Sequence, residues 1–360
     1  MKEFSELLKE MVGMNASDLH LKTGAHPVLR IDGALNPLKE YLFARQDVEK
    51  IIQKIMNAKQ QELFYRTGEC DLSYSEEGVG RFRGNVYRQR ENINIVFRYV
   101  PTKIPEFETL NLPPAVKKIA DNKRGLVLVT GTTGSGKTTT LASMIDHINS
   151  TRGVNIITIE DPIEFLHVDK LSIVSQRELG LDTLSFGDAL KNVVRQDPDV
   201  ILIGEMRDTE TMSAAITAAQ TGHLVFSTIH TISAIQTVSR IVDLFPPHQQ
   251  NQIRLELADT LKGVISQRLI PKVKGGRVPA VEILVVTEHI KKCIEQNTTA
   301  EILQAMKQGS YYGMQTFNQS LLNLHNAGLV SVEDALAAAT NPEELMMNIR
   351  GISSESGVVV

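Results

Sequence analysis

The sequence lacks several features that define whole classes of proteins. Its two cysteines, Cys70 and Cys293, are far apart and neither stands in a CxxC pair. This excludes a disulfide framework and a four-cysteine zinc site, and it fits a reducing cytoplasm. The longest apolar runs, such as 126–129, are far too short to cross a membrane, and the charged, amphipathic amino terminus is not typical of a secretory signal. We therefore expect a cytoplasmic protein without a membrane anchor.

Aromatic residues are also scarce, and no charge of one sign dominates. Tryptophan is absent, aromatic residues make up 5% of the chain, and the formal net charge is −4. Proteins that bind single-stranded nucleic acid combine a positive groove with aromatic side chains on which bases stack. The composition therefore disfavours a nucleic-acid partner. It is otherwise that of an ordinary globular protein, and 360 residues predict two or three domains.

The first hundred residues mix helical and strand spacing, which predicts a small α+β domain over residues 1–100. The expected elements are helices over 4–12 and 47–65, a hairpin around Asp32-Gly33, and strands near 69–75, 80–90 and 93–100. Prolines then cluster over 101–114, where they disfavour helix and remove backbone donors, so we predict a linker and hinge there.

From residue 115 the pattern changes to short apolar strands that alternate with helices, which is typical of a parallel α/β sheet. The expected strands are 125–130, 155–160, 199–205, 223–230 and 278–286. We predict that this domain covers 115–287 and that a helical region covers 288–360, of which the last ten residues form a loose tail.

A glycine-rich loop follows the first of these strands and leads into a helix-prone stretch. Residues 131–138 read GTTGSGKT, which is a complete phosphate-binding (Walker A) pattern in its required context. Glycines let backbone N–H groups point at phosphate oxygens, Lys137 is expected at the β- and γ-phosphates, and the Thr138 hydroxyl is expected on Mg²⁺. The predicted nucleotide contacts are Thr132, Thr133, Gly134, Ser135, Gly136, Lys137, Thr138 and Thr139.

Two carboxylates that follow apolar strands are candidates to orient an attacking water. Glu205 ends the strand 199–205, at the sheet edge where ligands bind in open α/β folds, and we also assign it to the metal site. Glu164 follows the strand 155–160 and Pro162, and it is the second candidate. One acid of that run could instead cap the turn that Pro162 enforces.

Histidines bracket the strand 223–230, with His223 at its start and His230 at its end. His230 lies on the side of the carboxylates, so we expect it to sense the γ-phosphate. We assign His223 as a further nucleotide contact, although a strand histidine is as often a packed, hydrogen-bonded residue.

Basic residues are concentrated over 80–103, and two of them, Arg81 and Arg83, share one face of a predicted strand. A rigid strand is a good platform for arginines that stabilise a γ-phosphate during hydrolysis. The alternative is a solvated basic face or a weak nucleic-acid patch.

Four segments together resemble the secretion ATPase superfamily, which powers type II secretion and type IV pili. In that family's order, they look like its Walker A, Asp box, Walker B and His box: GTTGSGKT, TIEDPIEF, RQDPDVILIGEMRD and TGHLVFSTIHT. SDLHL and GRFRGN are similar to its amino-terminal domain, and YGMQTFNQSL resembles the carboxyl-terminal region of PilT-type retraction ATPases. The resemblance implies an α/β protein in which a PAS-like α+β domain precedes a RecA-like P-loop NTPase domain with a C-terminal helical extension.

The resemblance also implies a function and partners. It implies a homohexamer that hydrolyses Mg²⁺-ATP to power pilus retraction and twitching motility. The hexamer would act at the cytoplasmic face of the inner membrane, on a platform protein at the pilus base, and a paralogous pilus ATPase is a further candidate partner. By analogy, Glu205 activates water, Glu164 supports it, His230 reports the nucleotide state, and Arg81, Arg83 and Arg98 approach the phosphates.

Several alternatives remain at this point. The chain lacks the four-cysteine module and the longer amino-terminal extension of pilus assembly and type II secretion ATPases, which favours retraction over those functions. Residues 289–295 read HIKKCIE where PilT-type proteins carry an AIRNLIRE-like segment, which leaves an accessory PilU-type ATPase as one alternative. A pilus assembly or type II secretion ATPase is another alternative, and further ones are a DNA translocase and a nucleotide-gated interaction module that does not hydrolyse ATP.

Overall fold

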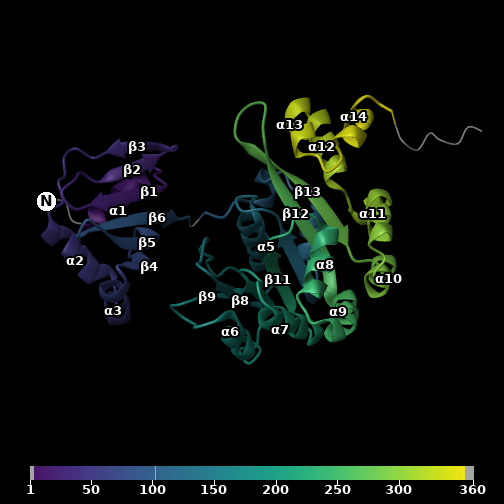
Figure 1. Cartoon of the computed structure of the whole chain (residues 1–360), viewed down its shortest axis with the longest axis horizontal. Helices are drawn as coiled ribbons and strands as arrows, with labels where there is room; N and C mark the ends of the chain where they lie inside the picture. The colour runs from purple at the N-terminus through teal and green to yellow at the C-terminus, as the bar shows by residue number, and fades with distance from the viewer. Residues whose placement is uncertain (1–3, 102, 353–360) are drawn as a thin grey trace, which may run out of the picture. The chain divides into compact units, whose positions relative to one another are not determined.

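The computed structural model describes residues 4–101 and 103–352 of the chain. These residues form two compact units, each with its own sheet and its own core (Figure 1). One unit comprises Met1–Lys103 and Pro162–Leu166, and the other comprises Ile104–Asp161 and His167–Val360. Of the expected tail, residues 353–360 lie outside the described residues, as does residue 102 of the expected linker.

The first unit is a six-stranded antiparallel sheet with the strand order β3-β2-β1-β6-β5-β4. Its helices are α1 (Phe4–Gly13), α2 (Arg45–Ile55) and α3 (Ala58–Thr67), and its strands are β1 (Asp18–Lys22), β2 (Val28–Ile31), β3 (Ala34–Pro37), β4 (Glu69–Glu76), β5 (Gly80–Gln89) and β6 (Asn92–Val100). The apolar faces of the helices and the sheet share one core, with Leu8, Phe64 and Phe97 among its fully buried residues.

Two local sequence features, a turn and a helix cap, determine where elements of this unit begin and end. Asp32 and Gly33 have φ of 48° and 84°, so a two-residue turn with left-handed backbone joins β2 to β3, as the hairpin prediction requires. The single helix predicted over 47–65 is wrong, because Asn57 breaks it into α2 and α3. The Asn57 side chain accepts from the Gln60 backbone N–H at 2.9 Å, and the Gln60 side chain accepts from the Asn57 N–H at 3.0 Å. This capping box starts a new helix.

The second unit contains a seven-stranded sheet with the strand order β13-β12-β7-β11-β10-β8-β9. Its strands are β7 (Gly125–Thr130), β8 (Asn155–Glu160), β9 (Ile173–Glu178), β10 (Val200–Ile203), β11 (Leu224–Ile229), β12 (Leu261–Pro271) and β13 (Arg277–Val285). Neighbouring strands from β12 to β9 run parallel, whereas β13 is antiparallel to β12. The expectation that 278–286 joins a parallel sheet is therefore wrong, because a short turn connects β12 directly to β13.

Helices flank this sheet, and a hydrophobic core lies on each of its two faces. The helices of the middle part are α4 (Pro114–Ala120), α5 (Lys137–Thr151), α6 (Phe186–Val193), α7 (Thr209–Gln220), α8 (Ala234–Asp243) and α9 (Pro247–Thr260). The short helix η1 (Phe107–Thr109) precedes α4, and Ser143 of α5 donates a hydrogen bond to the Pro105 carbonyl at 2.6 Å. Residues 104–114 are thus part of the second unit, and their predicted role as a hinge stays a prediction, as does the division at 100, 114 and 287.

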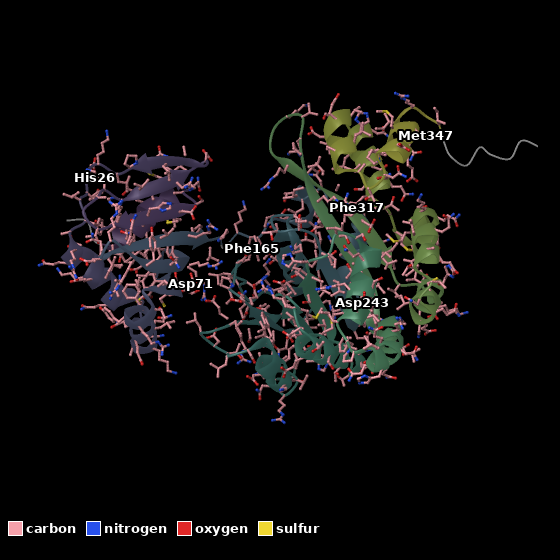
Figure 2. All side chains as sticks on the ribbon, viewed as in Figure 1. His26, Asp71, Phe165, Asp243, Phe317 and Met347 are labelled. Atoms are coloured by element: carbon pink, nitrogen blue, oxygen red, sulfur yellow. The ribbon has the colours of Figure 1, made fainter. Side chains whose placement is uncertain are left out.

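From Glu288 onward the described chain is helical, as the end of the strand pattern near 287 predicts. The elements are α10 (Glu288–Gln296), α11 (Thr299–Gln308), η2 (Gly309–Tyr312), α12 (Phe317–Asn326), α13 (Val332–Ala338) and α14 (Pro342–Ile349). Phe317 of α12, labelled in Figure 2, belongs to a small core that includes Ile270 and Val278 of the β12–β13 hairpin. The Arg268 guanidinium stacks over the Phe317 ring at 3.8 Å. The hairpin is therefore the platform for the last three helices.

Within residues 4–101 and 103–352, no helix is both long enough and apolar enough to cross a membrane.

The core of the first unit makes a direct stability prediction. Phe97 is fully buried, and its ring centroid lies 5.2 Å from that of Phe4. We expect Phe97→Ala to lower the free energy of unfolding of this unit by about 3–5 kcal/mol, because it removes apolar contacts and leaves a cavity. Leu35→Ala is the control, since Leu35 is 56% exposed and we expect an effect within about 0.5 kcal/mol. Urea unfolding of both variants tests this, and equal losses would contradict it.

Candidate functional site

The loop between β7 and α5 has a backbone that needs glycine. Gly131, Gly134 and Gly136 have φ of 145°, 77° and 91°, a region that residues with a Cβ rarely adopt. A Cβ at Gly131 would lie 2.5 Å from the Gln267 carbonyl oxygen. The glycines of this segment therefore let the chain curl tightly against β12 and into the first turn of α5.

Polar groups of this loop are arranged as a phosphate cradle requires. The Lys137 side chain is buried, and its Nζ donates to the carbonyls of Gly131 and Thr132, both at 3.0 Å. Within the described residues, the buried Ser135 hydroxyl has no hydrogen-bond partner. Residues 132–134 are exposed, and α5 starts at Lys137 with its free N–H groups. The residues present fit the phosphates of a nucleotide, with the Thr138 hydroxyl available for Mg²⁺.

Two side chains of β12 support the loop from behind. Gln267 Nε2 donates to Thr140 Oγ1 at 2.8 Å, and Ser266 Oγ lies 2.8 Å from Thr130 Oγ1. Both pairs are buried, so they tie the end of β7 and the start of α5 to the neighbouring strand. Sequence reasoning missed these residues, because β12 follows α9 without a break and was not recognised as a strand.

The sheet brings Glu205 and His230 to the same edge as the loop. The strands β7, β11 and β10 are adjacent and parallel, so their carboxyl ends meet at one edge. Glu205 follows β10 by two residues, and His230 directly follows β11. The His230 Nε2 lies 3.2 Å from Glu205 Oε1. The structure thus places these two predicted residues in contact.

A third residue, Arg207, completes this group and was not assigned to the site from sequence. Its Nη2 donates to Glu205 Oε2 at 2.7 Å. Burial raises the pKa of Glu205, but the Arg207 hydrogen bond and the electrostatic influence of His230, Arg207 and Lys137 outweigh it, so the pKa lies below its ordinary value. The carboxylate is therefore ionised at neutral pH and can accept a proton or a hydrogen bond from water.

The buried acid at the end of β8 is Glu160, whereas Glu164 comes four residues after the strand has ended. Glu160 Oε1 accepts from Thr158 Oγ1 at 2.6 Å and from Gln176 Nε2 at 3.0 Å. Since β8 pairs with β10, Glu160 lies on the strand next to the one that leads to Glu205. Glu164 is exposed and belongs to the segment Pro162–Leu166 of the first unit. Its predicted support of Glu205 stays a prediction.

His223 is not brought together with the loop. It directly precedes β11, at the amino end of the strand, whereas the loop and His230 lie at the carboxyl end. Six residues of strand separate the two edges by about 20 Å. The His223 Nδ1 instead lies 2.8 Å from the Ala218 carbonyl, so the histidine closes the turn after α7. His223 is therefore placed as a packed, hydrogen-bonded strand histidine would be. Its position does not support contact with a nucleotide bound in the loop of the same sheet.

The three predicted arginines share one face of the sheet in the first unit. Arg83 lies directly opposite Arg98 on the neighbouring strand, and Arg81 lies two residues from Arg83 on β5. Arg83 and Arg98 are exposed, and Arg98 Nε donates to the buried Asp18 at 2.8 Å. The expected common face of Arg81 and Arg83 is therefore confirmed, and their contact with a phosphate stays a prediction.

The chain is similar along most of its length to proteins of a known family. A family model described as Type II/IV secretion system protein matches residues 2–275. The chain is 45% identical over 341 residues to the type IV pilus retraction ATPase PilT of Pseudomonas aeruginosa, covering 95% of this chain and 99% of that protein. It is 40% identical to the type IV pilus ATPase PilU of the same organism, covering 98% of this chain and 93% of that protein.

The structural comparison agrees with these matches over nearly the whole chain. The crystal structure of the pilus retraction motor PilT with bound ADP superposes with a TM-score of 0.90 at 47% identity, and the match covers 96% of this chain and 99% of that chain. The predicted fold class, a RecA-like ATPase domain that follows an α+β domain and carries carboxyl-terminal helices, is thereby confirmed.

The contacts of Glu205 predict how its titration responds to a mutation. We expect Arg207→Ala to raise the pKa of Glu205, because the variant removes a hydrogen bond and a positive charge that favour the ionised carboxylate. Carbon-13 NMR of labelled glutamate side chains measures this pKa, and the Glu205→Gln variant identifies the signal. Arg195→Ala is the control, since Arg195 is exposed and does not act on Glu205. An unchanged pKa in Arg207→Ala would contradict the described contacts.

Proposed function

We propose that this chain, which belongs to the type II/IV secretion system protein family and is an ATPase of its pilus retraction branch, works as a homohexameric, Mg²⁺-dependent motor. The motor converts ATP hydrolysis into retraction of type IV pili. The observation that supports this proposal is the end-to-end match to the pilus retraction motor, in both sequence and fold, by a chain with a phosphate loop and an ionised carboxylate at one sheet edge.

Binding of ATP is assigned to the loop and the first turn of α5. The loop N–H groups and the Lys137 ammonium hold the phosphate oxygens, and Lys137 exchanges its loop carbonyls for the phosphates. The Thr138 hydroxyl and the Glu205 carboxylate would hold Mg²⁺. When bound, Mg²⁺ neutralises charge that develops on the phosphates.

Activation of water is assigned to Glu205. A carboxylate with a lowered pKa stays ionised, and it can orient a water for attack on the γ-phosphate and accept its proton. Arg207 positions this carboxylate by a hydrogen bond to one oxygen, and His230 lies 3.2 Å from the other. We also assign His230 to sensing the γ-phosphate. When the phosphate leaves, its negative charge is lost, and this loss would change the contact between His230 and Glu205.

The arginines of the first unit are assigned to the γ-phosphate. Arg81, Arg83 and Arg98 supply a positive face whose planar guanidinium groups match phosphate oxygens. Their engagement when ATP binds and their release after hydrolysis would move one unit relative to the other, with residues 101–114 as the hinge and Glu164 in support. Repeated around the hexameric ring, these movements would displace the protein on which the motor acts, which is its load.

The load is a platform protein at the pilus base, and the motor acts on it at the cytoplasmic face of the inner membrane.

Of the alternatives, an accessory role beside a paralogous pilus ATPase has a specific observation in its favour, since the chain is nearly as similar to PilU as to PilT. Expression of this chain in cells that lack both PilT and PilU distinguishes a retraction motor from an accessory ATPase. A motor restores pilus retraction, whereas an accessory subunit does not restore it alone.

Hydrolysis provides the direct biochemical prediction. We expect Glu205→Gln to lower kcat for ATP by about 10²–10⁴-fold while ATP binding persists, because the amide cannot accept the proton. Glu210→Gln is the control, because this exposed glutamate pairs with Lys191 on the surface. Steady-state ATPase assays and nucleotide titrations, with and without DNA, measure the effect. Full activity in Glu205→Gln would contradict the assignment, and stimulation by DNA would favour a translocase.

The arginine face yields a separate prediction. We expect Arg83→Ala to lower ATP turnover by up to about 10³-fold, because a guanidinium that contacts the γ-phosphate stabilises its transition-state charge. Arg88→Ala is the matched control: Arg88 lies on the same strand but on its opposite face, next to Phe64. If both variants keep the turnover of the unmodified chain, Arg83 has no role in hydrolysis.

A further inference from the structure

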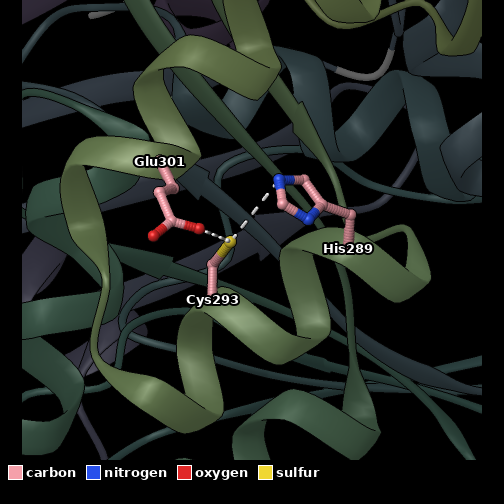
Figure 3. A group of neighbouring side chains, drawn as sticks. All are labelled: His289, Cys293 and Glu301. Atoms are coloured by element: carbon pink, nitrogen blue, oxygen red, sulfur yellow. Dashed lines mark hydrogen bonds between the residues drawn. The ribbon is translucent and has the colours of Figure 1, made fainter.

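Three side chains with metal-binding atoms meet at the junction of α10 and α11, away from the nucleotide loop. His289 and Cys293 lie one helical turn apart on α10, and Glu301 lies in the first turn of α11 (Figure 3). The ligand atoms of the three residues all lie within 4.8 Å of one another. This segment includes the residues 289–295 that depart from the retraction ATPase pattern.

The distances match those between ligands of one tetrahedral metal ion. Cys293 Sγ lies 3.8 Å from His289 Nε2 and 3.8 Å from Glu301 Oε2. Bonds of about 2.3 Å to sulfur and about 2.0–2.1 Å to nitrogen or oxygen, at a tetrahedral angle, require about 3.6 Å between such ligands. The two distances from the sulfur are thus within a few tenths of an ångström of what a common ion requires. The exposed His289 and Glu301 side chains, whose ligand atoms lie within 4.8 Å of each other, can rotate toward the same ion.

The backbone holds these side chains firmly and leaves one side open. Cys293 is 1% exposed and packs in the main core of the second unit, so its position is fixed. Asn297 ends α10 in a left-handed conformation, and the Thr298 N–H donates to the Cys293 carbonyl at 2.9 Å, which fixes the short turn to α11. His289 and Glu301 are exposed, so an ion can enter from solvent and keep a water as its fourth ligand.

We propose that His289, Cys293 and Glu301 form a binding site for one divalent transition-metal ion, with Zn²⁺ as the best-fitting ion. One sulfur, one nitrogen and one carboxylate oxygen are the ligand types that Zn²⁺ accepts, whereas Mg²⁺ takes oxygen ligands and does not bind thiolate. As the metal–sulfur bond forms, the Cys293 thiol loses its proton to solvent. Affinity therefore increases as pH rises.

The bound ion cross-links α10 to α11. α10 also contacts α9, through an ion pair of Lys291 with Asp259 and through the shared core. An ion at the junction therefore stiffens the connection between the sheet-packed helices and the following carboxyl-terminal helices. Because it binds only the folded arrangement, it stabilises the folded chain, and its removal lowers the Tm.

The test uses the full chain without an affinity tag, treated with chelator and kept in Mg²⁺ without nucleotide. Isothermal titration with Zn²⁺ should show one ion per chain. Titration with Co²⁺ should show the charge-transfer absorption of a cysteine–cobalt bond. His289→Ala and Glu301→Gln change exposed residues, and each should weaken Zn²⁺ binding by more than about 100-fold, because even the loss of an outer partner costs 10–100-fold.

Cysteine variants provide the matched control. Cys293→Ser should remove the cobalt–sulfur absorption, whereas Cys70→Ser should keep both it and the Zn²⁺ affinity, since Cys70 is equally buried but lies in the first unit. Failure of the unmodified chain to bind Zn²⁺ would overturn the proposal, as would bound Co²⁺ without sulfur absorption or Zn²⁺ affinity unaffected by His289→Ala and Glu301→Gln. None of these readouts depends on ATP hydrolysis, so the proposal stands or falls independently of the motor function.

Discussion

The parallel pairing of β7, β11 and β10 is the constraint on which the rest of the site depends. Parallel strands end at a common edge, so the loop after β7, Glu205 after β10 and His230 after β11 must gather there, although about 100 residues of chain separate them. The buried cores on both faces of the sheet hold the strands in register. A slip of β10 along its neighbours would move Glu205 away from both Lys137 and His230.

Charge balance at this edge then determines what the carboxylate can do. Burial on its own raises the pKa of a partly buried acid such as Glu205. Arg207 reverses this tendency by a hydrogen bond to one oxygen of Glu205, and His230 beside the other oxygen and Lys137 in the loop lower the pKa further. Lys137, which we propose binds phosphate, and Glu205, which we propose activates water, are therefore electrostatically coupled.

The sequence predicts the parts of this site that are local and leaves out those that depend on packing. The phosphate loop is recognisable because its glycines and its lysine stand at fixed spacing, and Glu205 because it ends an apolar strand. Arg207 could not be assigned, since a surface arginine two residues after a glutamate has many possible partners. Gln267 was missed because β12 lacks a break before it. The predicted nucleotide contact of His223 stays a prediction, and within its own sheet the residue lies at the amino end of β11, opposite to the loop. The split of α2 from α3, by contrast, was available in the Asn57 and Gln60 capping pair.

We propose that one edge of this sheet both holds the nucleotide and activates water. The most direct test is a structure of the chain with Mg²⁺ and a non-hydrolysable ATP analogue. We expect phosphates in the loop, the ion on Thr138, and the Glu205 carboxylate within one water of the γ-phosphate, still bonded to Arg207. A nucleotide bound away from Lys137, or a Glu205 carboxylate turned away from the γ-phosphate, would contradict it.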